Sequence, residues 1–239
     1  MSIIYVDIEH SRVATDLVAG VSHRTRLDAA RNRLAAASGE ECDLVHHRDV
    51  TIGHIRFLNP SAIVVSGNTA DWIEYDFTSL AGLLETIRAA PAPILGICGG
   101  HQLIGYAHGA RWGPLGRIPD GAIDQDPLFA PGLRTERGFR PIDVDTSCAL
   151  FQGLNAALVV YQSHYWQLTE TPVGFNVCAS SAACPIQALS MTDRPVFGVQ
   201  FHPERYDESH RDGEAMLRNF FNVARASATS RISSTVSVP

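Results

Sequence analysis

A cysteine stands in the middle of a glycine-rich pentapeptide, Gly96-Ile97-Cys98-Gly99-Gly100, directly after the short apolar run 94–97. A G-x-Cys-x-G pattern between a strand and a helix is typical of a nucleophile elbow, a sharp turn that exposes one reactive side chain. The turn needs strained backbone angles, and glycine neighbours leave room for the chain to pack around it. The helix expected at 101–108 favours a thiolate and offers N–H groups to an oxyanion. Cys98 is therefore the predicted nucleophile.

A base for this thiol follows a second apolar run, Val196–Phe201, which leads directly into His202-Pro203-Glu204. A residue before proline favours extended backbone, and in extended chain residues i and i+2 point to the same side. His202 and Glu204 can therefore face one site, with the carboxylate beside the imidazole. This spacing predicts a Cys98-His202-Glu204 triad in which His202 moves protons and Glu204 orients the ring.

The other polar clusters and cysteines suggest no further chemistry. Asp7, Glu9 and His10 gather at the end of an apolar run, and we interpret them as loop-capping groups rather than metal ligands. No C-x-x-C pair is present, so neither a structural zinc site nor any other metal or cofactor is predicted. The remaining cysteines are interpreted as buried and inert: Cys42, Cys148, Cys178 and Cys184.

The triad requires a scaffold that brings strand ends together. Over the first 110 residues, apolar runs alternate with helix-like segments, the runs at 3–6, 43–46, 62–65 and 94–97 and the helices at 24–37 and 77–89. This alternation predicts an α/β fold, an open, mostly parallel twisted sheet flanked by helices on both faces. Ligands of such sheets bind beyond the carboxyl ends of the strands. Three polar clusters fall there: Asp7–His10, Ser66–Asn68 and Cys98–Gly100.

The second half of the chain contains closely spaced strand-like runs and a last helix. The runs lie at 142–144, 158–161, 173–178, 187–190 and 196–201, and the helix at 208–226. Between the halves, 112–138 is rich in Pro, Gly, Asp and Arg and is expected to form a long excursion. We expect one domain over residues 1–226 and a disordered Ser/Thr-rich tail at 227–239.

The composition excludes several classes of function. All 19 basic residues are arginine, so the chain has neither a Schiff-base lysine nor a P-loop lysine, and an ATP-driven step would belong to another chain. The net charge of −6 argues against binding to nucleic acid or to an anionic membrane. The N-terminus lacks the pattern of a signal peptide, and no run approaches 18 apolar residues. A cytoplasmic, non-membrane location is therefore expected.

Two segments together resemble the signatures of the class I (triad) glutamine amidotransferases. They are 93–104, which contains Cys98, and 197–204, which contains His202 and Glu204. Weaker matches to the same family lie in the expected order at 63–67, 136–138 and 162–166. The resemblance extends from about residue 2 to residue 224 and is nearest to the amidotransferase part of GMP synthetases. It implies a flavodoxin-like fold.

The resemblance also implies a reaction and its residues. Cys98 would attack the side-chain amide of L-glutamine, and the backbone N–H groups of Gly67 and Gly99 would stabilise the oxyanion. The amino-acid end of the substrate would be held by Gln102, Ser163, His164 and Tyr165. The ammonia would pass to a separate ATP-dependent synthetase, the expected partner.

The sequence departs from the family in three places. Asn68-Thr69 replaces Gly-Pro after Ser66-Gly67, and Tyr165-Trp166 replaces an acidic pair. The excursion at 117–135 is longer than in the GMP synthetase relatives, and we expect a lid or docking loop there. Two other functions stay open, a stand-alone γ-glutamyl peptide or amide hydrolase with the same triad and a non-catalytic regulatory relative.

Overall fold

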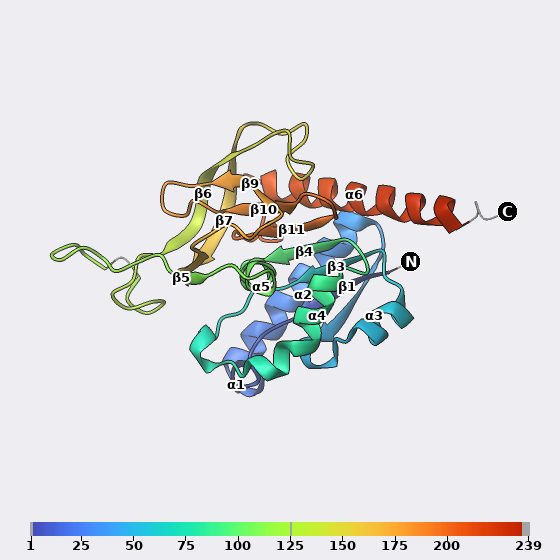
Figure 1. Cartoon of the computed structure of the whole chain (residues 1–239). Helices are drawn as coiled ribbons and strands as arrows, with labels where there is room; N and C mark the ends of the chain where they lie inside the picture. The colour runs from blue at the N-terminus through green and yellow to red at the C-terminus, as the bar shows by residue number, and fades with distance from the viewer. Residues whose placement is uncertain (1, 125, 236–239) are drawn as a thin grey trace.

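A mixed nine-stranded sheet forms the centre of the computed structural model, which describes residues 2–124 and 126–235 (Figure 1). The strand order is β2-β1-β3-β4-β11-β10-β9-β6-β7. The strands are β1 (Ser2–Asp7), β2 (Glu41–His46), β3 (Ala62–Val65), β4 (Ile94–Ile97), β6 (Glu136–Val144), β7 (Ala157–His164), β9 (Phe175–Ser180), β10 (Ala188–Met191) and β11 (Val196–Val199). The first five in spatial order pair in parallel, and each later neighbour pairs antiparallel. Only β10 and β6 of these described strands therefore oppose the common direction, which confirms the predicted mostly parallel sheet.

Helices cover both faces of the sheet, as predicted. One face packs against α2 (Ala19–Ser38) and α6 (Asp212–Thr235) through Leu27, Leu34 and Phe220. The other packs against α3 (Ile52–Leu58), α4 (Ala81–Ala89) and α5 (Gly99–Ala107). Because both faces are covered, β3 and β4 are buried at every position and read as unbroken apolar runs rather than alternating ones.

Short elements complete the described chain. The turns between the longer elements are α1 (Ser11–Thr15), η1 (His47–Asp49), η2 (Trp72–Glu74) and η3 (Phe77–Leu80). A separate two-stranded sheet joins β5 (Trp112–Pro114) to β8 (Trp166–Leu168). The excursion that leaves β5 projects from the body of the molecule, green at the left of Figure 1, and an isolated bridge pairs Arg117 with Leu133.

The end of the chain differs from the expectation. The last helix begins at Asp212 rather than at 208, because Asp207 accepts the N–H groups of Ser209 and His210 and closes a turn there. It continues to Thr235, so residues 227–235 of the tail predicted to be disordered are helical. This stretch is mostly serine and threonine, so its helix extends from the packed first part of α6 rather than from a high helix propensity of its own. Residues 236–239 lie outside the described residues.

No helix in the described part of the chain is both long enough and apolar enough to cross a membrane.

Candidate active site

The nucleophile elbow forms where β4 meets α5. Cys98 has φ 52° and ψ −102° and immediately precedes α5, in a backbone region that side-chain-bearing residues rarely adopt. A Cβ at Gly96 would collide with the backbone of Gly100, and a Cβ at Gly100 would collide with the carbonyl of Val65. The glycines at 96 and 100 therefore let the strained turn pack against its neighbours, as the sequence predicted.

His202 and Glu204 pair as the spacing predicted. His202 Nδ1 lies 2.8 Å from Glu204 Oε1. The segment is held from both sides, because the His202 N–H donates to the Tyr161 carbonyl at 2.8 Å and Arg33 of α2 donates to the Glu204 carbonyl at 2.7 Å. The backbone of the base is thus fixed between β7 and α2.

The charge of His202 is set by its two neighbours. Burial by itself lowers the pKa of His202, but the charges and hydrogen bonds of Glu204 and Cys98 outweigh it and raise that pKa to about 10. The ring is therefore an imidazolium at neutral pH and stands beside the sulfur.

The loop after β3 lies between nucleophile and base. A Cβ at Gly67 would stand 3.1 Å from His202 Cε1 and 3.2 Å from Cys98 Cβ, so Gly67 faces both side chains and a larger residue there would crowd them. A Cβ at Gly99 would collide with the Asn68 side-chain oxygen, which lies over the start of α5. Within the described residues, the N–H groups of Gly67 and Gly99 have no protein acceptor.

Asn68 fits this loop without glycine's conformational freedom. Among the described residues, positive φ outside glycine occurs at Asn59, Ala90 and Cys98, and not at Asn68. The Asn68 amide instead donates to the Ala70 carbonyl at 2.8 Å. The replacement of a glycine at this position therefore does not strain the loop.

Two pockets adjoin the triad. The Cys98 pocket contains Cys98 and every substrate-binding residue predicted from the sequence; its lining includes Cys98, Gln102, Ser163, His164, Tyr165 and Trp166. The α2 pocket is a larger cavity of about 350 Å³ lined by Gly67, His202, Glu204 and the arginines Arg26, Arg33 and Arg205. Asn68, Thr69, Phe129 and Ser163 line both pockets. Cys98, His202 and Glu204 thus stand where the two pockets meet.

The side chains of Gln102 and His164 are engaged with other protein groups. Gln102 accepts a hydrogen bond from Trp72 at 2.6 Å and donates to the Trp166 carbonyl and to Gln200, both at 3.0 Å. Gln200 in turn points its amide at Cys98 Sγ, 3.6 Å away. Gln102 is therefore part of the wall behind the nucleophile, with its amide already hydrogen-bonded to other protein groups.

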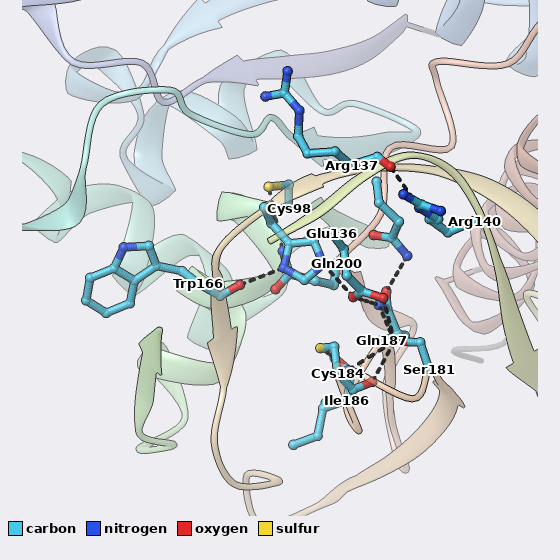
Figure 2. A network of polar contacts seen from close by, with 12 residues as sticks. Cys98, Glu136, Arg137, Arg140, Trp166, Ser181, Cys184, Ile186, Gln187 and Gln200 are labelled. Atoms are coloured by element: carbon cyan, nitrogen blue, oxygen red, sulfur yellow. Dashed lines mark hydrogen bonds and ion pairs between the residues drawn. The ribbon is translucent and has the colours of Figure 1, made fainter. Parts of the chain in front are cut away.

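A buried polar network continues from this wall behind residue 164. Nδ1 of His164 faces the Trp166 carbonyl at 2.9 Å, and Nε2 faces Glu136 Oε2 at 3.0 Å. Glu136 also accepts hydrogen bonds from Ser181 at 2.8 Å and Gln187 at 2.7 Å. Figure 2 shows Glu136, Ser181 and Gln187 gathered on one side and Gln200 beside Cys98 on the other. Burial alone raises the pKa of Glu136, but its hydrogen bonds hold that pKa below the usual value.

An aromatic pair closes the far side of the Cys98 pocket. The hydroxyl of Tyr165 donates to Asp71 Oδ2 at 2.6 Å, and the Trp166 ring N–H lies 3.3 Å from the same oxygen. Burial and the Asp71 carboxylate raise the pKa of Tyr165, so its hydroxyl stays protonated as a donor. Phe129 of the excursion packs edge-on against Tyr165, with ring centroids 5.4 Å apart.

Several residues of the site carried no role in the sequence interpretation. Gln200 stands two residues before His202, and the i, i+2 rule that paired His202 with Glu204 could have placed it on the same side. Asp71, Trp72 and Phe129 line the Cys98 pocket or support its lining from segments without a recognisable motif. No signal within the sequence could have found them.

A family model described as glutamine amidotransferase class-I matches residues 30–224. The chain is 36% identical over 166 residues to one subunit of the glutamine-hydrolyzing GMP synthase of Pyrococcus abyssi, a match that covers 70% of this chain and 77% of the relative. It is 34% identical over 176 residues to the glutamine-hydrolyzing GMP synthase of Listeria innocua, a match that covers 74% of this chain but only 30% of the relative. A solved structure from Thermoplasma acidophilum, described as a GMP synthase subunit, superposes with a TM-score of 0.70 over 97% of this chain and 98% of that one, at 24% identity.

Proposed function

Because the chain belongs to the class I glutamine amidotransferase family, we propose that it hydrolyses the side-chain amide of L-glutamine through a Cys98 thioester and supplies the ammonia to a separate synthetase. The observation that carries this proposal is the contact geometry of three segments. A Cβ at Gly67 would stand 3.1 Å from His202 and 3.2 Å from Cys98, and His202 is paired with Glu204 at 2.8 Å. The proposed nucleophile, its base and the Gly67 loop are therefore close enough to act on one substrate group.

The geometry supports a two-step acyl transfer. The Cys98 thiolate attacks the amide carbon of glutamine, and the N–H groups of Gly67 and Gly99 stabilise the negative charge that develops on the amide oxygen. The His202 imidazolium gives its proton to the departing nitrogen, so that the C–N bond breaks and ammonia leaves a γ-glutamyl thioester. Neutral His202 then takes a proton from water, the hydroxide adds to the thioester, and glutamate leaves as Cys98 is regenerated.

The Cys98 pocket is the proposed glutamine site. Its wall includes Ser163, His164 and Tyr165, and the ring of Trp166 shares the Asp71 anchor with Tyr165. Since the polar atoms of the Gln102 and His164 side chains already have protein partners, we assign these two residues to shaping the pocket and orienting its backbone. The 163–165 segment then presents its backbone to the amino-acid end of glutamine.

A synthetase of the GMP synthase type is the proposed partner. The Pyrococcus abyssi relative is named as one subunit of a GMP synthase, and the Listeria innocua relative is more than three times as long as the matched segment. This chain has no lysine and hence no P-loop lysine, so the ATP-dependent step falls to the partner. We place the partner against the mouth of the α2 pocket, where three arginines border the triad, and we expect both proteins in the cytoplasm.

The two other functions that the sequence left open have less support. A γ-glutamyl peptide hydrolase needs room beyond the amide nitrogen, whereas Asp71 anchors Tyr165 and Trp166 at the wall of the Cys98 pocket. A non-catalytic relative would not need the strained Cys98 backbone or the buried His202–Glu204 pair. Neither function has a specific observation in its favour.

The test is turnover of L-glutamine by the purified chain, alone and with the synthetase encoded in the same organism, measured as glutamate and ammonia. Cys98→Ala should lower kcat by about 10⁴-fold or more, because no other group can form the thioester. Faster release of glutamate from γ-glutamyl dipeptides than from glutamine would contradict the proposal. Absence of turnover in both preparations would do so as well.

A further inference from the structure

Resting on the function proposed above, we propose that Glu9 is a positioning residue for glutamine hydrolysis, which holds the loop that presents the Gly67 N–H to the substrate. Glu9 follows β1 and its side chain is only 1% exposed. Together with Asp7 and His10, it is interpreted from the sequence as a loop-capping group. Its carboxylate turns toward the residues that directly follow Gly67.

The Glu9 carboxylate accepts several hydrogen bonds from the short loop that follows Gly67. Oε2 accepts the Thr69 N–H at 2.8 Å and the Thr69 hydroxyl at 2.6 Å. Oε1 accepts the N–H of Ala70 at 3.1 Å and that of His10 at 3.0 Å. A buried carboxylate with this many charge-assisted hydrogen bonds fixes the backbone that it contacts. The loop after Gly67 is thus tied to the end of β1.

The other end of the same loop is tied independently. The Ser66 N–H donates to the Val6 carbonyl at 2.9 Å, and the Gly100 N–H donates to the Ser66 carbonyl at 3.0 Å. The Ser66 hydroxyl accepts from the Ile8 N–H at 3.1 Å and donates to the Gly67 carbonyl at 2.9 Å. Gly67 is therefore suspended between two anchors, of which Ser66 is one and the Glu9 carboxylate is the other.

The position of this loop leaves little tolerance. A Cβ at Gly67 would stand 3.1 Å from His202 and 3.2 Å from Cys98, so this part of the loop lies close to both side chains. Movement away withdraws an N–H from the oxyanion, and a hydrogen bond weakens steeply with distance and angle. Thr69 supplies both a hydroxyl and an N–H to Glu9, where the proline usual in the family could supply neither. Glu9 and Thr69 together take over the stiffness that a proline would provide.

Two further groups border Glu9 without replacing it. His23 of α2 bonds Asp7 at 2.9 Å, and its other ring nitrogen lies 4.0 Å from Glu9 Oε2. The Tyr75 hydroxyl donates to the Ile8 carbonyl at 3.0 Å and lies 3.5 Å from Glu9 Oε1. Neither of them contacts Thr69 through a hydrogen bond, so the Thr69 donors depend on Glu9.

The experiment compares Glu9→Gln with Glu40→Gln. A carboxamide at position 9 directs an N–H at groups that are themselves donors, whereas Glu40 accepts one hydrogen bond from Ser61 at the opposite end of β1 and β3. For Glu9→Gln we expect kcat for glutamine to fall about 10²-fold, in the range found when an oxyanion donor is lost. The rate of Cys98 alkylation by iodoacetamide should stay within about twofold of wild type. The KM for glutamine should change far less than kcat, because Thr69 lines the Cys98 pocket but the contact with the oxyanion is made only in the transition state. Glu40→Gln should match the wild-type chain.

A kcat equal to wild type in Glu9→Gln would overturn the proposal. A fall in kcat that comes with an equally large fall in the Cys98 alkylation rate, or an equally large rise in the KM for glutamine, would overturn it as well. Thr69→Val serves if Glu9→Gln does not fold: it removes the hydroxyl donor alone and should lower kcat by about threefold to tenfold. An unchanged kcat in Thr69→Val would then overturn the assignment. All variants are measured beside wild type, alone and with the synthetase. Failure of the wild-type chain to hydrolyse glutamine in both preparations would reject the proposed function rather than the role of Glu9.

Discussion

The triad and the polar network behind His164 are both buried and hydrogen-bonded, yet they are built in different ways. The triad stands at the ends of parallel strands, and its members belong to two short segments, Cys98 in one and His202 with Glu204 in the other. The network joins Glu136, His164, Ser181 and Gln187 from the antiparallel part of the sheet. Glu136 and His164 are direct cross-strand partners of β6 and β7.

The two regions have different structural properties, which suggest different tasks. In the triad, the Cys98 backbone is strained by its positive φ, and the side chain of His202 carries a positive charge. In the network, the polar side chains form hydrogen bonds with one another, and these bonds stiffen the wall of the Cys98 pocket. Damage to the triad should therefore change turnover more than stability, and damage to the network should change stability more than turnover.

The largest effect is expected at the charged end of the triad. Glu204→Gln removes the charge that orients His202 and raises its pKa, so kcat for glutamine should fall by about 10³-fold or more while KM changes little. Steady-state glutamate release measures both. A loss of less than about tenfold would show that the segment backbone, held by Tyr161 and Arg33, orients His202 without the carboxylate.

The same variant makes a prediction about stability and pH. Because the folded-state pKa of His202 is raised from 6.5 to about 10, its protonation stabilises the native state fully below about pH 6.5 and ceases to do so as pH rises through about 10. The advantage of the wild-type chain over Glu204→Gln in urea unfolding should therefore be greatest near pH 6 and shrink toward pH 10. A difference that grows with pH over this range would contradict the imidazolium assignment.

Glu136→Gln tests the network and should give an intermediate effect on turnover. The substitution weakens charge-assisted hydrogen bonds from His164, Ser181 and Gln187 and should lower the unfolding free energy by about 2 kcal/mol. The KM for glutamine should rise a few-fold, since residue 164 lines the Cys98 pocket. Chemical denaturation and steady-state kinetics measure the two effects.

The control for this variant is Glu170→Gln, which breaks an exposed pair with Arg111 and should leave the unfolding free energy nearly unchanged, because water screens the two charges. Since the pKa of Glu136 is held below its ordinary value of 4.5, its contribution is present above that pH and is lost as pH falls. The gap in stability between wild type and Glu136→Gln should therefore narrow in acid. A gap that stays constant down to pH 3 would show that the carboxylate charge is not what the network uses.

The smallest effect is expected at the excursion. Phe129 lines both pockets and packs against Tyr165, so Phe129→Ala should raise the KM for glutamine by about threefold and leave kcat nearly unchanged. The adjacent Leu128→Ala is the matched control, because Leu128 is 98% exposed. Equal kinetics in the two variants would argue against a lid at 117–135 and favour its use as a docking loop.

The sequence predicted those features of the fold and the site that depend on residues close together along the chain. Three glycines around one cysteine, directly after an apolar run, were enough to predict the elbow at Cys98, because the sharp turn depends on the steric limits of consecutive residues. The base needed only the extended backbone before proline, which placed His202 and Glu204 on one side. The α/β fold followed from apolar runs whose length and continuity are set by burial on both faces of the sheet.

The tail shows where local composition misled. Ser/Thr-rich sequence predicted disorder from residue 227, yet α6 continues through Thr235, because a helix already nucleated on the sheet adds further residues at little cost. The first part of α6 buries Met216, Phe220 and Ala224, and that packing is a property of the whole fold. The amino-acid composition of the tail does not reveal this packing.

By itself the sequence determined the elbow around Cys98, the pairing of His202 with Glu204 and the sheet that carries them, since these depend on neighbours along the chain. Only the tertiary structure decided that Glu9 holds the loop beyond Gly67, that Glu136 supports His164, and that Asp71 anchors Tyr165. Each of these contacts joins residues 28 to 94 positions apart. Their hydrogen bonds depend on strand register and loop placement, which the packing of the entire chain establishes.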